Sequence, residues 1–252
     1  MSDERKKWQM SDNLPEWLFD ETTHVGVDYA DRDLVADYDR QHEGFRDFEK
    51  EAEKIVTVLG LSEDSTILDL GCGTGGLSIC LARKCKHVYA VDVSQAMVDA
   101  LTGKLENQGL SNVTPRRSGF LTYKHKGEAP DAIVLNITLH HLSDFWKQIA
   151  LCRLHDLLKP GGKMFLADIV FGFDPRAYEQ TIDNWLNYMR ELAGPQMADE
   201  AVVHVPRLLQ LRFQTNQHEP FGNAVWLLSM AGSYHTERLA SPRGCSRGTM
   251  YI

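Results

Sequence analysis

Long hydrophobic runs are missing from this chain of 252 residues, and so is any C-x-x-C pair of cysteines. No stretch approaches about 18 apolar residues, and the N-terminus has no apolar segment of the kind found in secretion signals. The five cysteines are odd in number, which argues against a disulfide framework and against a thiolate zinc site. We therefore expect a cytoplasmic protein with no membrane-spanning segment.

Basic residues are also in deficit. Lys and Arg together number 27 against 35 Asp and Glu, which gives a formal net charge of −8. A general nucleic-acid binder normally shows a basic face, so this balance argues against that class. The length fits one α/β domain with additions and is enough to bury a substantial core.

Residues 66–76, T-I-L-D-L-G-C-G-T-G-G, constrain the function more tightly than any other stretch. The aliphatic run Thr66–Leu70 predicts a buried parallel strand, and a helix is expected to begin at Leu77. Between them stand four glycines: Gly71, Gly73, Gly75 and Gly76. A strand, a glycine turn and a helix N-terminus let a ligand approach bare backbone N–H groups, which favours a nucleotide-like ligand. Asp69 precedes the first glycine by two residues, at the carboxyl end of the strand.

Strands and helices are predicted to alternate along most of the chain. The apolar spacing of residues 31–59 indicates a helix that Gly60 stops. The other predicted strands are 87–91, 112–117, 131–136 and 163–171, with 207–213 and 224–230 as further candidates. Helices are expected after the N-caps Ser94 and Asp144, and over about 175–192. Pro115 places the third strand near an edge or at a bulge.

This order predicts right-handed βαβ units around a mostly parallel sheet. Ligands bind such sheets at the carboxyl ends of the strands, where the strand order reverses. The site is therefore expected among the residues that end or follow the strands: 71–75, 92–94, 118–120, 136–141 and Asp168.

The glycines alone leave two cofactors open. Gly71, Gly73 and Gly76 satisfy G-x-G-x-x-G, and Asp92 lies at the distance expected of a ribose-binding acid, as in an NAD-binding oxidoreductase. Three features argue against NAD. A stretch of about 65 residues precedes the motif, Asp69 would repel a pyrophosphate, and no Tyr-x-x-x-Lys pair follows the fourth strand.

Four motifs in order carry a family resemblance: I-L-D-L-G-C-G-T-G (67–75), V-Y-A-V-D-V-S-Q-A-M (88–97), N-I-T-L-H-H-L-S-D (136–144) and L-K-P-G-G (158–162). Over about residues 45–171 the chain resembles the class I S-adenosylmethionine-dependent methyltransferases. It is most similar to the small-molecule enzymes whose fourth strand ends in a similar L-H-H sequence. Ala30 to Arg40, with Tyr38 and Asp39, looks like the cap helix ahead of such domains.

The resemblance implies an α/β, Rossmann-like fold: a mostly parallel twisted sheet with helices on both faces, an N-terminal helical cap and an irregular C-terminal tail. We expect an arm and cap helix over 1–60, an S-adenosylmethionine-binding core over 61–200 and an atypical C-terminal segment over 201–252. That last segment does not resemble the usual finish of the family. An alternative is therefore a cofactor-binding but catalytically impaired protein with an altered C-terminus.

The resemblance also implies roles for single residues. Asp69 should attract the ammonium of the cofactor, the Gly71 to Gly73 backbone should hold its methionine part, and Asp92 should bind both ribose hydroxyls. Val93 and Met97 should pack on the adenine. The complete implied cofactor-binding set is Asp69, Gly71, Cys72, Gly73, Thr74, Gly75, Asp92, Val93, Ser94, Met97, Gly119, Phe120 and Asn136.

One position departs from the family pattern. Ser118-Gly119-Phe120 stands where the family often has Gly-Asp-Phe, whose acid bonds the adenine amino group. That acid is missing here. We expect a backbone contact from Gly119 or Phe120 to replace it.

The chemistry at the acceptor is less constrained. Either His140 or His141 is a candidate base or orienting residue, because imidazole titrates near neutrality. A metal site built from these two histidines and Asp144 would have no convincing third ligand, so we expect no metal site. Asp168 either faces the pocket or is a buried, hydrogen-bonded acid. The absence of N-P-P-aromatic after the fourth strand and the acidic net charge favour a small-molecule acceptor; the oligomeric state stays open.

Overall fold

The structure is a computed structural model. It describes residues 15–22, 46–170 and 174–195, the backbone of 222–229, and the separate residues 35, 38, 39, 198, 199, 201, 202 and 205. The strand candidate 207–213 and the end of the chain lie outside the described residues. Within the expected cap helix only Val35, Tyr38 and Asp39 are described, and all three are helical.

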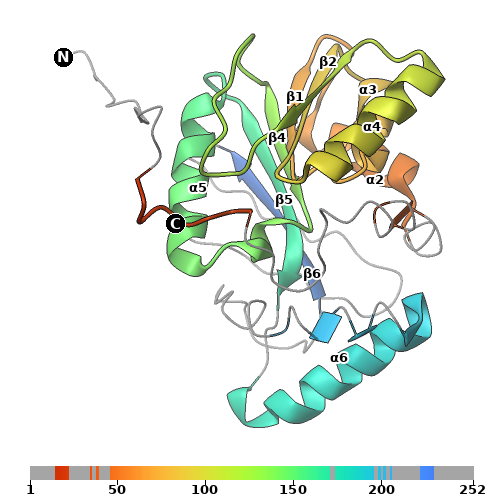
Figure 1. Ribbon diagram of the computed structural model, residues 1–252, viewed down its shortest axis with the longest axis vertical. Helices are drawn as coiled ribbons and strands as arrows, with labels where there is room; N and C mark the ends of the chain where they lie inside the picture. Colours follow the sequence, from red (N-terminus) through yellow and green to blue (C-terminus); the bar gives the residue numbers. More distant parts are fainter. Residues whose placement is uncertain are drawn as a thin grey trace.

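Six strands form one sheet in the order β3-β2-β1-β4-β5-β6 (Figure 1). The first five are parallel, and β6 pairs antiparallel with β5. Their bounds are β1 Thr66–Leu70, β2 His87–Asp92, β3 Val113–Arg117, β4 Ala132–Asn136, β5 Lys163–Val170 and β6 Gly222–Ser229. The α/β, Rossmann-like fold predicted from the sequence is confirmed.

Helices lie on both faces of the sheet, and α6 lies apart from it (Figure 1). Their bounds are α2 Phe48–Leu59, α3 Gly76–Ala82, α4 Gln95–Gln108, α5 Asp144–Leu157 and α6 Tyr178–Ala193, with 3-10 turns η1 Leu139–His141 and η2 Pro175–Ala177. Figure 1 shows α5 on one side of the sheet and α2, α3 and α4 on the other. No helix in the described part of the chain is long and apolar enough to cross a membrane.

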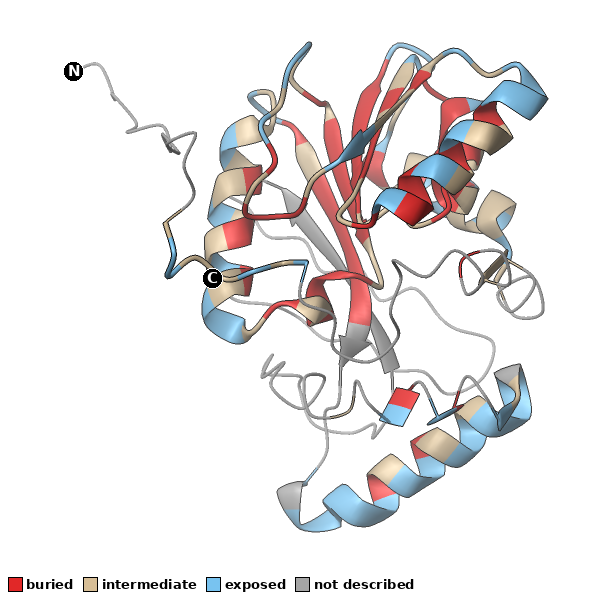
Figure 2. Cartoon of the chain, viewed as in Figure 1, coloured by how far each residue is buried: buried red, intermediate tan, exposed pale blue. Residues whose placement is uncertain are grey.

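Two apolar clusters fill the two faces of the sheet (Figure 2). Neighbouring residues of β1 enter different clusters, because successive side chains of a strand point to opposite faces: Ile67 packs with α2, α3 and α4, whereas Leu68 packs with α5. All five residues of β1 are buried, as expected of a central parallel strand. The glycine motif therefore starts from a fully buried strand.

Most predicted boundaries are confirmed, but the helix predicted over 31–59 is wrong at its start. Arg46 is not helical, and α2 begins at Phe48 after its N-cap Asp47, whose side chain accepts from the Lys50 N–H. Gly60 ends α2 in the left-handed conformation, and the Ser94 side chain caps α4 by accepting from the Met97 N–H. Pro115 does lie in an edge strand, β3. The prediction for Asp144 is wrong: Ser143 holds the N-cap position, and Asp144 is the first helical residue, where its carboxylate pairs with Lys147 at 3.0 Å.

The strand order places the candidate site. From β1 the chain adds β2 and β3 on one side and then returns to add β4 and β5 on the other side. The order therefore reverses between β1 and β4, and the loops after these two strands meet at the sheet edge where α/β proteins bind ligands.

Candidate functional site

The glycine turn after β1 uses its backbone donors internally. Gly71, Gly73 and Gly75 have φ values of 76°, 54° and 82°, which side-chain-bearing residues rarely adopt. The N–H groups of Gly71 and Cys72 donate to the Val91 carbonyl at 2.8 and 3.0 Å, and that of Gly75 donates to the Cys72 carbonyl at 3.0 Å. The Gly73 N–H donates to a carboxylate oxygen of Asp92 at 2.8 Å. The expectation of bare N–H groups is wrong for these four residues.

This pattern of donors changes which ligand the turn suits. A pyrophosphate needs backbone N–H groups directed at it, and four of those in this turn are already engaged. The turn is instead flanked by the carboxylates of Asp69 and Asp92. Such surroundings suit a ligand that carries positive charge and hydroxyl groups.

Asp69 is 2% exposed at the end of β1 and accepts a hydrogen bond of 2.5 Å from the Ser78 hydroxyl of α3. Burial raises the pKa of its carboxyl to about 6, opposed by the Ser78 hydrogen bond and the charge of Arg46. A buried carboxylate with a raised pKa is stabilised by any cation that approaches it. Asp69 therefore favours a positively charged ligand group beside the turn.

Asp92 ends β2 with both carboxylate oxygens engaged. One oxygen accepts from the Gly73 N–H and the other from the Ser94 N–H at 2.9 Å. Burial raises the pKa of Asp92, and the backbone hydrogen bonds from Ser94 and Gly73 oppose that rise. Each oxygen has a second lone pair for a ligand hydroxyl.

The cap segment is fastened to the glycine turn. The Thr74 hydroxyl donates to Asp39 at 2.5 Å, and Lys104 of α4 binds both Asp39 at 2.5 Å and the Thr74 carbonyl at 3.0 Å. On the same side Val35 packs against Met97. The sequence singled out Asp39 and Thr74 but gave no sign of Lys104, because its partners lie far away along the chain.

A second group missed by the sequence analysis holds Asn136. Its side-chain amide donates to Glu51 of α2 at 2.9 Å, and Glu51 in turn receives two hydrogen bonds from Arg46, at 2.6 and 3.1 Å. The Arg46 guanidinium also lies 4.4 Å from the centre of the Phe48 ring. No local motif marks Glu51, which lies in a helix that shows only the spacing of its apolar face, or Arg46, which precedes that helix.

The turn after β4 is strained and closely packed on the glycine turn. Ile137 has a φ of 57°, an outlier for a β-branched residue, and its N–H donates to the Ala167 carbonyl at 2.7 Å. The next residue, Thr138, lies so close to Gly71 that a Cβ there would stand 1.9 Å from the Thr138 hydroxyl oxygen. Gly71 is thus required both by its backbone conformation and by this contact.

His140 is buried and held by Asp168. The carboxylate accepts from the His140 N–H at 2.9 Å and lies 2.8 Å from the His140 Nδ1 atom, and the two residues are 6% and 1% exposed. Of the two alternatives for Asp168, the buried and hydrogen-bonded acid is observed. His141 is half-buried, with its ring centroid 4.3 Å from that of His140.

The remaining candidates line the same edge of the sheet. Val93 and Ser94 follow Asp92 directly, and the Ser118 N–H donates to the Asp92 carbonyl at 2.8 Å, which brings Gly119 and Phe120 alongside. Cys72 is a poor nucleophile, because desolvation and the charges of Asp92 and Asp69 raise the pKa of its thiol. Gly119 contacts the Glu21 carboxylate, a residue that the sequence analysis did not single out.

Comparison with known proteins finds similarity to methyltransferases. Residues 67–162 match the family described as Methyltransferase domain. An uncharacterized methyltransferase of Geobacillus kaustophilus is 31% identical over 58% of this chain and 67% of its own length. One of Schizosaccharomyces pombe is 34% identical over 43% of this chain, but the match spans only 40% of that relative. A SAM-dependent methyltransferase from Aquifex aeolicus has a TM-score of 0.48 at 27% identity, over 57% of this chain and 76% of that structure.

Proposed function

The chain belongs to the methyltransferase family, and on that basis we propose that it transfers a methyl group from S-adenosylmethionine to a small molecule. The observation that carries this proposal is the pairing of an internally bonded glycine turn with two carboxylates of raised pKa. This arrangement suits the cationic, ribose-bearing cofactor and does not suit a pyrophosphate. The NAD alternative is accordingly disfavoured.

Several residues of the chain are assigned to cofactor binding. Asp69 is proposed to receive the ammonium group, and Asp92 the two ribose hydroxyls. Asn136, oriented by Glu51, is proposed to flank the methionine part. Arg46, which is paired with Glu51 and whose charge acts on Asp69, is proposed to receive the carboxylate of that methionine part.

S-adenosylmethionine supplies a methyl group that its sulfonium already activates, so the protein mainly has to align the acceptor and exclude water. We assign the alignment to the turn after β4, where Ile137 is strained and Thr138 packs on Gly71. His140 is the proposed base for an acceptor that starts protonated. With Nδ1 donating to Asp168, its Nε2 atom is the one that takes the proton.

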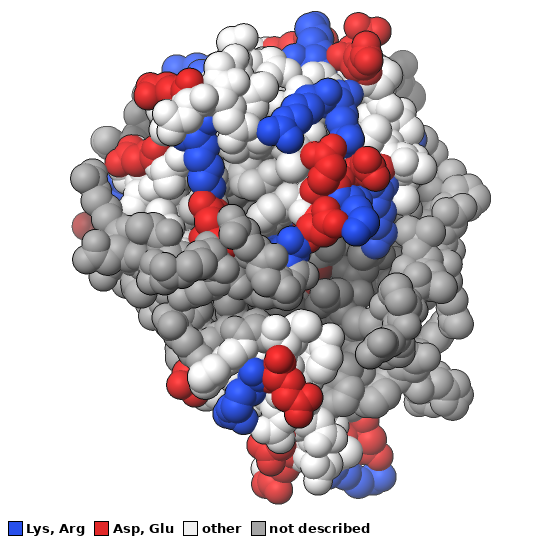
Figure 3. Space-filling model, turned by 90° about the vertical axis from the view of Figure 1, so that its right-hand side faces the viewer, with Lys and Arg blue, Asp and Glu red and all other residues white. Residues whose placement is uncertain are grey.

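A small-molecule acceptor is supported by charge. Lys, Arg, Asp and Glu side chains are interspersed on the described face in Figure 3, rather than gathered by sign. The sequence after β4 reads N-I-T-L and lacks the N-P-P-aromatic pattern of many amino-group methyltransferases that act on DNA bases or glutamine. With the acidic net charge, these features favour a small molecule, and the cysteine usage favours a cytoplasmic location.

Calorimetry with S-adenosylmethionine, S-adenosylhomocysteine and NADH tests the proposal. We expect the first two to bind and NADH not to bind, and the reverse result would overturn the assignment. A methyl-transfer screen over small oxygen, sulfur, nitrogen and carbon acceptors then tests turnover. Tight cofactor binding with no transfer to any of them would favour the catalytically impaired alternative.

A further inference from the structure

Position 119 has no room for a side chain, although its backbone conformation would allow one. It is absent from the residues with positive φ, so a side chain would not strain the backbone there. A Cβ on Gly119 would instead stand 2.4 Å from both Cδ and Oε2 of Glu21, and 2.6 Å from Oε1. The Glu21 carboxylate therefore fills the space that a side chain at position 119 would occupy.

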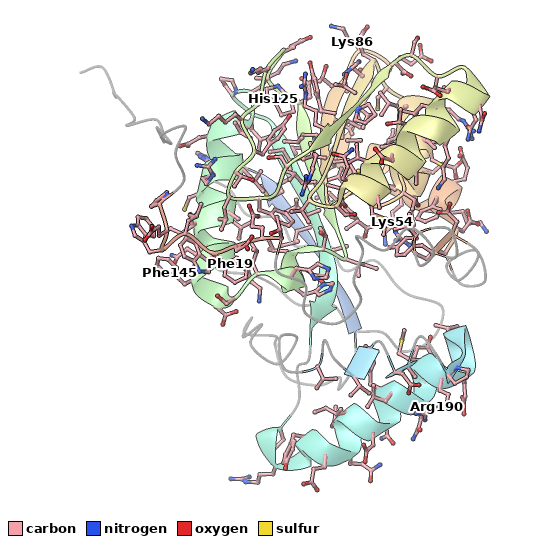
Figure 4. The ribbon with its side chains drawn as sticks, in the orientation of Figure 1. Phe19, Lys54, Lys86, His125, Phe145 and Arg190 are labelled. Atoms are coloured by element: carbon pink, nitrogen blue, oxygen red, sulfur yellow. The ribbon has the colours of Figure 1, made fainter. Side chains whose placement is uncertain are left out.

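The segment that delivers Glu21 is anchored on α5. Leu18 and Phe19 pack against the apolar cluster on that face of the sheet, and the Phe19 ring lies 6.2 Å from that of Trp146. Figure 4 shows Phe19 beside Phe145 at the start of α5. Next to Glu21, Asp20 accepts from the N–H and hydroxyl of Thr22 at 2.9 and 2.6 Å. Residues 15–22 thus cross α5 and end at the loop after β3.

The Glu21 carboxylate is held in place by that loop. Its oxygens lie 3.0 and 2.9 Å from the Leu121 N–H, and Oε2 lies 3.3 Å from the Thr122 hydroxyl. A carboxylate has about four lone-pair sites, so these contacts leave acceptor capacity. Burial raises the pKa of Glu21, opposed by the backbone hydrogen bonds from Leu121 and Phe120 and by the hydrogen bonds from Thr122.

The loop that holds Glu21 is also tied to the ribose-binding candidate. The Ser118 N–H donates to the Asp92 carbonyl at 2.8 Å, and the Gly119 N–H donates to Thr122, which also contacts Glu21. The loop of residues 118–122 is therefore bonded to the backbone of Asp92 at one end and to the carboxylate of Glu21 at the other. A loop that joins two acids in this way suits the ribose and the base of one nucleoside.

We propose that Glu21, brought in by the N-terminal arm, is the acid that accepts the hydrogen bond from the exocyclic amino group of the adenine. It takes the place of the acid missing at position 119. This inference rests on the proposed function, because it concerns the base of the same cofactor. It assigns to residues 15–22 a part in selecting the nucleoside.

The test compares two ligands that differ at one group. S-inosylhomocysteine carries a carbonyl oxygen where S-adenosylhomocysteine carries the amino group. We expect the wild-type protein to bind the adenosyl compound about 10- to 100-fold more tightly, because the carbonyl faces a carboxylate. In Glu21→Gln, whose amide can donate to that carbonyl, the ratio of the two Kd values should fall by about 10-fold or more. Glu16→Gln, an exposed change in the same segment, should keep the wild-type ratio.

A relocated acid provides the second arm. Glu21→Ala should lose the preference for adenine, and Gly119→Asp added to it should restore the preference, since the space beside residue 119 is then empty. Gly119→Asp alone should weaken binding of both ligands, because its side chain meets Glu21. Thermal unfolding of each variant checks that it is folded.

The outcomes separate two failures. If Glu21→Gln lowers both affinities equally, or if the double variant stays unselective while folded, Glu21 serves only to hold the loop and the inference is wrong. If the wild-type protein binds neither ligand, the proposed function itself fails.

Discussion

The Asp92 carboxylate accepts a hydrogen bond from the Gly73 N–H at 2.8 Å, so the proposed ribose-binding acid also holds the glycine turn closed. Its second oxygen binds the Ser94 N–H at the start of α4. One side chain therefore links the turn after β1 to the turn after β2. Changes at Asp92 should affect both the binding of the cofactor and the order of its site.

Asp92→Ala should weaken S-adenosylhomocysteine binding about 10- to 100-fold, because hydrogen bonds to a charged group contribute about 1.5–3 kcal/mol. Asp92→Asn keeps one acceptor oxygen for Gly73 or Ser94 and should lose less. Calorimetry measures both values. An unchanged affinity in Asp92→Ala would remove this residue from the site.

Asp69 should make stability depend on pH. Burial raises its pKa from the ordinary value of 3.8 to about 6 in the folded chain, so the folded state takes up this proton more readily than the unfolded state. Its stabilising contribution is present below about pH 4 and is lost as the pH rises through about 6, by about 3 kcal/mol in total.

Asp69→Asn provides the matched control, because its amide does not titrate and still accepts from Ser78. The free energy of unfolding is measured with urea at pH 4.5 and 7.5. Between these two pH values it should fall more in the wild-type protein than in the variant. A difference between the two proteins that is constant with pH would contradict the raised pKa.

The His140–Asp168 pair should be costly to break. Asp168→Ala leaves the buried His140 N–H and ring nitrogen without their acceptor, which should lower the free energy of unfolding by about 2–4 kcal/mol. Asp168→Asn retains an acceptor for one of these donors, so its loss should be smaller. Denaturant unfolding of the two variants gives the comparison, and equal losses would contradict a stabilising role for the acceptor that Asn retains.

The contact between Asp39 and Thr74 should couple the cap to the glycine turn. A double-mutant cycle of Asp39→Asn and Thr74→Val, read by unfolding free energies, should give an interaction of about 1–2 kcal/mol. Lys104 also binds Asp39, so each single change disturbs more than one contact. A coupling near zero would mean that the hydrogen bond between Asp39 and Thr74 does not contribute to holding the two segments together.

Substitutions at Gly71 and Gly109 distinguish the energetic cost of a left-handed backbone from the cost of a steric clash. Both have a left-handed φ, but a Cβ on Gly71 would meet Thr138 at 1.9 Å while one on Gly109 would meet nothing within 4 Å. Gly109→Ala should cost about 1–2 kcal/mol from conformation alone. Gly71→Ala should cost about 1–3 kcal/mol more from overpacking. Adding Thr138→Ala should recover part of that excess, and no recovery would exclude the steric cause.

The strands and the glycine turn could be predicted because their signals are local. A buried run such as Thr66–Leu70 and a stop such as Gly60 are visible within a few residues. Partners that lie far apart along the chain left no such trace. Glu21 is bonded to Leu121, 100 residues away, and Glu51 is bonded to Asn136, 85 residues away. The fold alone decides these pairs, so no spacing rule could find them.

Two predictions failed for physical reasons. The glycine turn was expected to offer free N–H groups, but the carbonyl of Val91 in the neighbouring strand takes two of them. Asp144 was expected to cap α5, but Ser143 takes the N-cap position, and the Asp144 carboxylate pairs with Lys147 one turn further along. In both cases a nearby partner satisfied a group that the sequence suggested was available.

Pro115 on the edge strand β3 hinders the addition of a strand from a second copy of this protein. The Asn112 carbonyl and the Ser118 N–H both bond to β2, so the even-numbered residues of β3 direct their backbone groups inward. Pro115 and Arg117 belong to the outward series. A second chain that tried to extend the sheet at this edge would find a missing donor and an exposed charge, which protects the folded protein against edge-to-edge aggregation.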